Sequence, residues 1–138
     1  MTSEPIAARR KGADPAVFLI ADSGFNPYAT VVVTRRELLQ KNPGLVKEFV
    51  LATRQGWRDY LDHPETTNAL LGKLNSALDE ATLSAAAEAQ KPLIETDDSK
   101  QHGLGSMQQA RWQTLADQLL DLKFLDKPLS VADSFEQL

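Results

Sequence analysis

Two short apolar runs separated by a turn dominate the first 34 residues. The run AVFLIAD at residues 16–22 is continuous, and the run YATVVVT at residues 28–34 is rich in β-branched residues. Such runs are typical of strands buried on both faces of a sheet. The intervening DSGFNP contains residues that favour turns. The pattern therefore predicts two strands joined by one sharp loop.

After Thr34 the apolar residues change to helical spacing. Asn42-Pro43 is a start signal, and the apolar positions that follow predict a helix over residues 43–61. Gly56 inside this helix costs about 1 kcal/mol relative to alanine, which predicts that another backbone or ring packs closely against it. Similar reasoning predicts short helices at 35–41 and 64–74 and longer ones at 79–91 and 108–122, with residues 92–107 as a polar loop.

This order predicts an α/β protein with few strands followed by several helices. We expect residues 1–138 to form a single unit, with its strands within 1–34 and helices over 35–138. Two strands alone are marginal in water. The predicted sheet therefore needs further strands from the first dozen residues, from a second copy, or from sequence preceding Met1.

Composition excludes several classes of function. The chain is 42% hydrophobic and 25% charged, as is usual for a globular domain, and its formal net charge of −4 without a basic stripe argues against nucleic-acid binding. It has no cysteine, which excludes disulfides, thiolate metal sites and cysteine nucleophiles. No apolar run is long enough to span a membrane, and the opening MTSEPIAARRKGADP lacks the apolar centre of a signal peptide.

Candidate catalytic groups are few. His63 precedes a proline at a helix end and His102 precedes a glycine in a predicted loop, so both favour structural or solvated roles. The acidic ETDDS at 95–99 lacks the glycine and distal glutamate of a calcium loop, and GLGS at 103–106 lacks the lysine and preceding strand of a phosphate loop. We predict no catalytic residue, no metal site and no cofactor.

The opening stretch contains the best candidates for ligand binding, because ligands of α/β proteins bind at the ends of strands. Amides of the loop could donate to a polar ligand, and a tyrosine could stack on it or form a hydrogen bond. An equally weighted alternative is that these residues only form the turn. The candidates are Ser3, Glu4, Asp22, Ser23, Gly24, Asn26 and Tyr28.

Residues 2–65 also resemble the second half of the solute-binding proteins of ABC importers for thiamine-pyrimidine precursors, nitrate, taurine and alkanesulfonates. The matching features are Glu4-Pro5, ADSG at 21–24, VVVT at 31–34, Asn42-Pro43, and AT with GW within 52–57. The tail from 103 to 135 resembles the family's ending, which has a tryptophan-bearing helix and a Lys-Pro pair.

The resemblance implies a two-lobed type II periplasmic-binding-protein fold, with this chain as its C-terminal half. It implies a small organic ligand held between the lobes, with Glu4 and the loop Asp22 to Tyr28 near the cleft or hinge. It further implies docking on a membrane permease and a periplasmic or cell-envelope location. Because most ligand contacts would lie in the other half, we expect this chain to bind pyrimidines and sulfonates weakly.

Two alternatives stay open at this point. A related enzyme of the same fold synthesises the thiamine pyrimidine, but its activity is associated with a cysteine-rich motif that this chain lacks, so we do not predict an enzyme. A ligand-free interaction module derived from the fold is the second alternative. In this alternative, a second copy of the chain would complete the sheet by forming a homodimer. A separate N-terminal half of the binding protein could complete the sheet in the same way.

Overall fold

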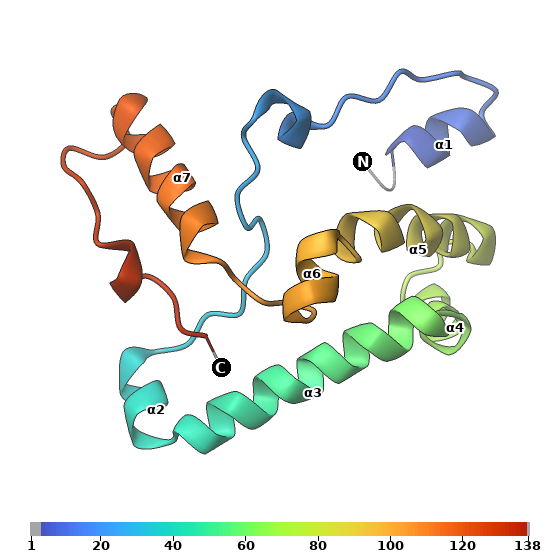
Figure 1. The fold of residues 1–138 in the computed structure, drawn as a ribbon. Coiled ribbons are helices and arrows are strands. Elements are labelled where there is room, and N and C mark those ends of the chain that lie inside the picture. Colours follow the sequence, from blue (N-terminus) through green and yellow to red (C-terminus); the bar gives the residue numbers. More distant parts are fainter. Residues whose placement is uncertain (1–3, 138) are drawn as a thin grey trace. The chain divides into compact units, whose positions relative to one another are not determined.

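Helices and extended segments build the described part of the chain. The computed structural model describes residues 4–137 (Figure 1). The helices are α1 (Glu4–Arg10), α2 (Arg36–Lys41), α3 (Pro43–Asp62), α4 (Glu65–Leu74), α5 (Glu80–Ile94), α6 (Asp97–His102) and α7 (Gln109–Asp121), and there are two short 3-10 turns, η1 (Ile20–Ser23) and η2 (Val131–Asp133). Residues 4–137 contain no strand. The predicted α/β fold class, with strands within 1–34, is therefore wrong.

The two segments predicted as strands contain extended backbone but do not pair. Leu19 in the first segment lies in the β region (φ −83°, ψ 128°), but the end of that segment belongs to η1 (Ile20–Ser23). Arg35, the residue after the second segment, also lies in the β region (φ −73°, ψ 138°). Within the described residues no backbone hydrogen bond joins the two segments, and Phe18 and Val33 are 89% and 84% exposed. Apolar β-branched runs favour an extended backbone, but a strand also needs a neighbouring backbone. The local preference is present, and the pairing partner is absent from residues 4–137.

Contacts within the chain define two compact units, each made from two separate stretches of sequence. Unit 1 comprises the described residues up to Val17 together with Leu51–Gly105, and unit 2 comprises Phe18–Val50 together with the described residues from Ser106 onward. Unit 1 contains α1, the later part of α3, and α4 to α6, whereas unit 2 contains α2, the start of α3, and α7. That residues 1–138 form a single domain stays a prediction.

In unit 1, α4 and α5 pack against each other around a small core. Leu61, Leu83 and Ala87 are buried there. Asn68 is only 2% exposed, and its Oδ1 accepts a hydrogen bond from the Tyr60 hydroxyl at 3.2 Å. A buried amide is costly unless it is hydrogen-bonded, so this contact supports the position of α4 beside α3.

The start of α5 is stabilised by a cap and an ion pair within unit 1. The Asp79 Oδ1 accepts a hydrogen bond from the Thr82 backbone N–H at 2.8 Å, which satisfies a free donor of the first turn. Arg10 of α1 donates to both Asp79 and Thr82. The Arg10 hydrogen bond, followed by that of the Thr82 amide, holds the pKa of Asp79 below its usual value. The predicted start of this helix at residue 79 is thereby confirmed.

The end of α5 differs from the prediction. The helix continues through Pro92 to Ile94, although a proline beyond the first turn removes a hydrogen bond and crowds the carbonyl four residues earlier. Thr96 then caps α6, its Oγ1 accepting from the Ser99 N–H at 3.2 Å. The predicted loop over 92–107 is therefore wrong for much of its length.

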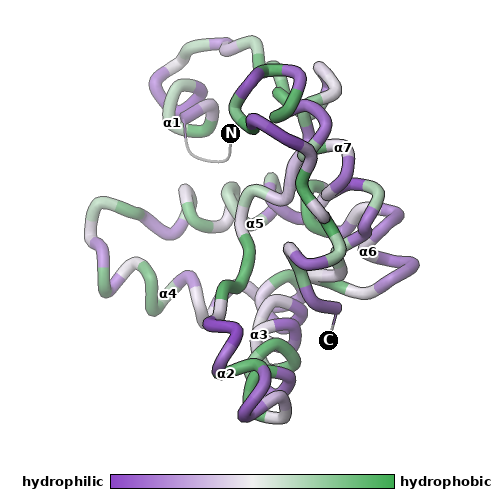
Figure 2. The backbone as a smooth tube through the Cα atoms, turned by 90° about the vertical axis from the view of Figure 1, so that its left-hand side faces the viewer, coloured by the Kyte–Doolittle hydropathy of each residue, from purple (hydrophilic) through white to green (hydrophobic). Residues whose placement is uncertain are grey.

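Unit 2 has its own small core. Val46 in α3, Ala116 in α7 and Val131 in η2 are buried, and α7 packs against η2. The helices predicted at 43–61 and 108–122 are confirmed as α3 and α7. Green stretches in Figure 2 mark the hydrophobic residues along the chain, and several of the large ones are solvent-exposed, including Phe18, Ile20 and Val33.

We expect Gly56→Ala to raise the free energy of unfolding by about 1 kcal/mol, because alanine loses less backbone entropy in a helix than glycine does. Apart from its chain neighbours and the backbone of its own helix, no described atom lies within 4 Å of the position that a Gly56 Cβ would take. The close packing predicted at this glycine is therefore wrong. Thermal unfolding followed by circular dichroism would show a higher Tm.

Gly24 provides the contrasting control for this prediction. It also has nothing within 4 Å of a Cβ, but its φ is +89°, a conformation that L side chains rarely adopt. Gly24→Ala should therefore lower the Tm. A Tm that falls in the Gly56→Ala variant as well would contradict the explanation.

Candidate functional site

The loop that joins the two extended segments starts as a turn in unit 2. In η1 the Ser23 hydroxyl donates to the Ile20 carbonyl at 2.6 Å, and Gly24 ends the turn in the left-handed region. The Gly24 carbonyl then accepts a hydrogen bond from Gln118 Nε2 of α7 at 3.0 Å. The turn residues DSGFNP thus place the following chain against α7.

Arg111 of α7 holds this loop by several contacts. Its Nε donates to the Asn26 carbonyl at 2.6 Å, and its Nη2 donates to Asn26 Oδ1 at 2.7 Å and to the Pro27 carbonyl at 3.1 Å. Its guanidinium carbon lies 4.2 Å from the centre of the Tyr28 ring, within the range of a cation–π interaction. A planar guanidinium with three hydrogen bonds fixes both the loop and the direction of its remaining N–H groups.

Three aromatic side chains of this unit, beginning with Tyr28, pack in a row. The rings of Tyr28 and Trp112 have centroids 5.7 Å apart, and Trp112 stacks on Phe135 at 5.9 Å with an interplanar angle of 14°. The Tyr28 hydroxyl accepts a hydrogen bond from the Gln108 backbone N–H at 2.7 Å, just before α7 begins. Aromatic packing and this hydrogen bond together orient α7 against the loop.

A cavity of about 250 Å³ lies between the loop and α7. Several of its polar groups are already bonded, since Thr114 donates to the Ala110 carbonyl and Gln118 Nε2 donates to Gly24. Within the described residues, Arg111 Nη1 makes no hydrogen bond, which leaves a charged donor available. The lining residues are Gly24, Asn26, Pro27, Ala110, Arg111, Thr114, Leu115 and Gln118.

This lining can bind a polar solute but offers few groups for catalysis. It includes no carboxylate and no histidine, the side chains that most often act as general acids and bases. Arg111 can donate a hydrogen bond, and the Gln118 side-chain oxygen can accept one. No group of three His, Asp or Glu side chains placed to hold a metal ion occurs within residues 4–137.

The structure distributes the predicted site residues unequally. Gly24 and Asn26 line the cavity, and Tyr28 adjoins it through Arg111. Asp22 and Ser23 lie in η1 and do not line it, and the Ser23 hydroxyl is bonded within its own turn. Glu4 belongs to α1 in unit 1, and Ser3 lies outside the described residues.

Sequence reasoning missed the α7 side of this site. Arg111, Thr114 or Leu115, and Gln118 recur at helical spacing, so they share one face of the helix. This helical spacing was the signal available in the sequence. It places polar side chains in a row beside the apolar face of the helix, which indicates that this face contacts a polar segment rather than the hydrophobic core. The loop as its partner could not be inferred, since residues 26 and 111 are far apart in sequence.

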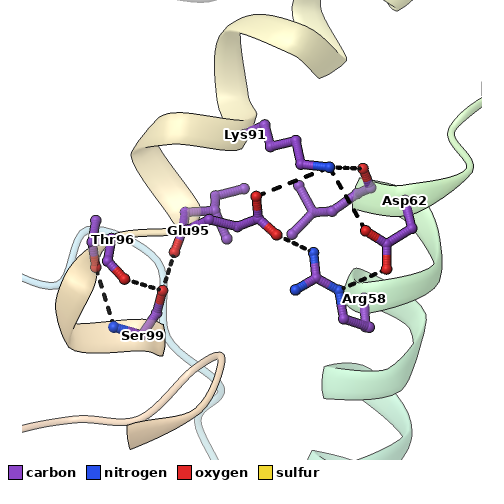
Figure 3. Close-up of polar contacts among 8 residues, drawn as sticks. Arg58, Asp62, Lys91, Glu95, Thr96 and Ser99 are labelled. Carbon is purple, nitrogen blue, oxygen red and sulfur yellow. Dashed lines mark hydrogen bonds and ion pairs between the residues drawn. The ribbon is translucent and has the colours of Figure 1, made fainter. Parts of the chain in front are cut away.

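Unit 1 contains a cluster of charged residues that joins α3 to the end of α5 (Figure 3). Arg58 donates to Glu95, and its Nε lies 3.0 Å from an Asp62 carboxylate oxygen. Lys91 Nζ donates to the Leu61 carbonyl at 3.0 Å and lies 3.7 Å from Asp62 and 4.0 Å from Glu95. The hydrogen bond that Arg58 donates to Glu95 raises the pKa of Arg58 above its usual value, against the opposing effect of desolvation.

Comparisons with known proteins agree with the resemblance noted in the sequence. The family model described as NMT1/THI5 like matches residues 1–67. The riboflavin-binding protein RibY of Chloroflexus aurantiacus is 26% identical over 136 residues, which cover 96% of this chain and 38% of the relative. No solved structure matches the chain significantly.

Both matches point to the NMT1/THI5-type solute-binding family, so the family resemblance predicted from the sequence is confirmed. The chain spans only 38% of the relative's length. No helix within residues 4–137 combines the length and apolar character needed to cross a bilayer.

Proposed function

We propose that this chain is part of the solute-binding component of an ABC-type importer, and that its role is binding without catalysis. The observation that carries the proposal is the arrangement of Arg111, which fixes the loop at Asn26 and Pro27 while its Nη1 remains available beside a cavity. The two family matches support the general role. The proposal includes docking on a membrane permease and a location outside the cytoplasm.

The cavity favours a small solute with both an acceptor and a donor. Arg111 Nη1 can donate to a ring nitrogen or a sulfonate oxygen, and the Gln118 side-chain oxygen can accept from an amine. An aminopyrimidine precursor of thiamine and taurine both have these groups, whereas nitrate only accepts. The volume of about 250 Å³ lies below that of most pockets for drug-sized ligands, so riboflavin, the ligand in the relative's name, would extend beyond it.

Calorimetric titration of the 138-residue chain with an aminopyrimidine, taurine, nitrate and riboflavin tests this proposal. We expect dissociation constants weaker than micromolar, because the cavity supplies few polar groups, and tighter binding of the first two solutes than of nitrate. Ala110→Leu fills the cavity without removing any side-chain hydrogen bond and should weaken binding about tenfold.

Gln113→Leu is the matched control, since Gln113 lies on α7 but does not line the cavity. It should leave the dissociation constants unchanged. Binding that survives Ala110→Leu would place the solute elsewhere and overturn the assignment of this cavity. A submicromolar constant would contradict the expectation that the chain alone binds weakly.

A second candidate function is that of an interaction module that forms a homodimer. The observation that favours it is the pair of unpaired apolar segments with Phe18 and Val33 exposed. Unpaired extended backbone with apolar side chains is a template for strand pairing with another chain. A second copy of the chain would supply two extended segments that are equally apolar. We therefore propose that, in the isolated chain, a second copy pairs with these segments.

A further inference from the structure

We propose that unit 1 holds a separate binding site for a small organic oxyanion carrying a phosphate or carboxylate group. The site is a cavity of about 330 Å³ formed by the later part of α3, the end of α5, α6 and the turn that follows it. It shares no residue with the proposed solute cavity and does not depend on that function. Its lining residues are Arg54, Gln55, Arg58, Glu95, Ser99, Lys100, Gly103 and Leu104.

The charges around this cavity leave an excess of positive charge. The cluster in Figure 3 contains two cations, Arg58 and Lys91, and two anions, Asp62 and Glu95, so its formal charges cancel. Arg54 lines the same cavity and makes no ion pair within the described residues. An arginine facing a cavity whose other charges are already balanced favours an anion as its partner.

Arg54 is also short of hydrogen bonds. Its Nε is buried and has no hydrogen-bond partner within residues 4–137. A buried donor without a partner is destabilising, so a bound acceptor would remove this cost. The Arg54 fork can donate two parallel hydrogen bonds to two oxygens of one phosphate or carboxylate group.

Gly103 keeps the space beside Arg54 open. It follows α6 with φ +93°, and a Cβ at this position would lie 3.8 Å from Arg54 Nη1. A glycine is favoured here because of its backbone conformation, and it also lets an anion approach the guanidinium without meeting a side chain. The backbone turn and the free arginine thus occur at the same place.

The remaining lining residues indicate the size and chemistry of the anion. Lys100 has an exposed side chain and only a loose contact with Asp97 at 3.7 Å, so it can turn toward a second oxygen. Leu104 adds an apolar surface. The cavity volume of about 330 Å³ exceeds that of a bare ion, which favours an organic anion over inorganic phosphate.

Side-chain NMR of the full chain tests the proposal at the residue concerned. Titrating phenyl phosphate and, separately, benzoate should shift the Arg54 Nε–Hε signal and the Gly103 amide signal in a saturable way. Inorganic phosphate should bind more weakly than phenyl phosphate because it makes no contact with Leu104. Potassium chloride at matched ionic strength should cause no saturable shift, and a response to either organic anion supports the site and identifies the preferred group.

Variants separate this site from general charge effects. Arg54→Gln should weaken binding at least tenfold, read at the Gly103 amide, because it removes charge-assisted hydrogen bonds. Lys100→Gln should weaken anion binding about threefold, which is typical of the loss of a solvent-exposed ion pair. This variant keeps Arg54, so the Arg54 signal can still be followed. Arg35→Gln, at an exposed arginine of unit 2, is the control and should change nothing.

Two results would overturn the site. The first is a shift in phenyl phosphate and benzoate no larger than that in potassium chloride. The second is unchanged affinity in both Arg54→Gln and Lys100→Gln, with amide spectra showing that the variants are folded. Neither result affects the proposal for the solute cavity. That proposal is tested separately, by calorimetry with other ligands and with the Ala110→Leu variant.

Discussion

Replacing Trp112 with alanine is expected to lower the free energy of unfolding of unit 2 by about 3 kcal/mol. The Trp112 ring has its centroid 5.7 Å from that of Tyr28 and 5.9 Å from that of Phe135, so truncation removes two aromatic contacts at once. The Arg111 and Gln118 hydrogen bonds would still hold the loop at residues 24–28 to α7, but Tyr28 would lose its ring contact with Trp112. Denaturant unfolding followed by near-ultraviolet circular dichroism measures the loss.

The chain's other tryptophan provides the matched control. Trp57 is 41% exposed and has one aromatic contact, an edge-on one with Tyr60 at 5.9 Å. Trp57→Ala should therefore cost about 1 kcal/mol, and Trp112→Phe, which keeps a ring between Tyr28 and Phe135, should cost less than Trp112→Ala. Equal losses in the two alanine variants would contradict the central role of Trp112 in unit 2.

The second large effect concerns association. If a second copy pairs with the exposed extended segments, native mass spectrometry of the gently purified chain should show a dimer without a small-molecule adduct. Val33→Lys places a charge where an apolar side chain would be buried, so it should weaken the dimer by about tenfold or more and yield monomers.

Leu45→Lys is the control for this experiment, because Leu45 is also exposed but lies on α3 outside the extended segments. It should leave the dimer intact. A dimer that persists in Val33→Lys would mean that another surface mediates association. A wild-type monomer carrying a small-molecule adduct would instead contradict the interaction module and favour a binding site that this chain keeps by itself.

The helices were largely predictable because their signals are local. The helix predicted at 43–61 is α3 (Pro43–Asp62), and the one predicted at 108–122 is α7 (Gln109–Asp121). Apolar spacing, a proline at the first helical position and a capping aspartate at Asp79 all act within a few residues. The end of α5 was not predicted, because residues 92–107 are rich in polar and turn-forming residues, whereas the structure continues the helix through Pro92 to Ile94.

The predicted strands failed for a different reason. Residues 16–22 and 28–34 have the composition of buried strands, but a sheet exists only where another backbone supplies hydrogen bonds. Within residues 4–137 no such backbone pairs with them, and their apolar side chains remain exposed. Their composition thus indicates that these segments would need neighbouring strands to form a sheet, but it does not show that such strands are present.

By itself, the sequence determined α2, α3, α4, α7 and the start of α5, but not α1 or α6. It also determined the turn at residues 22–27 and the resemblance to a solute-binding family, because each of these rests on neighbouring residues or on an ordered series of short motifs. Only the tertiary structure decided that Arg111 holds Asn26, and that Arg58 meets Glu95. Such pairs join residues that are distant in sequence, and their contact depends on how whole helices pack. No local pattern of charge or hydrophobicity specifies that packing.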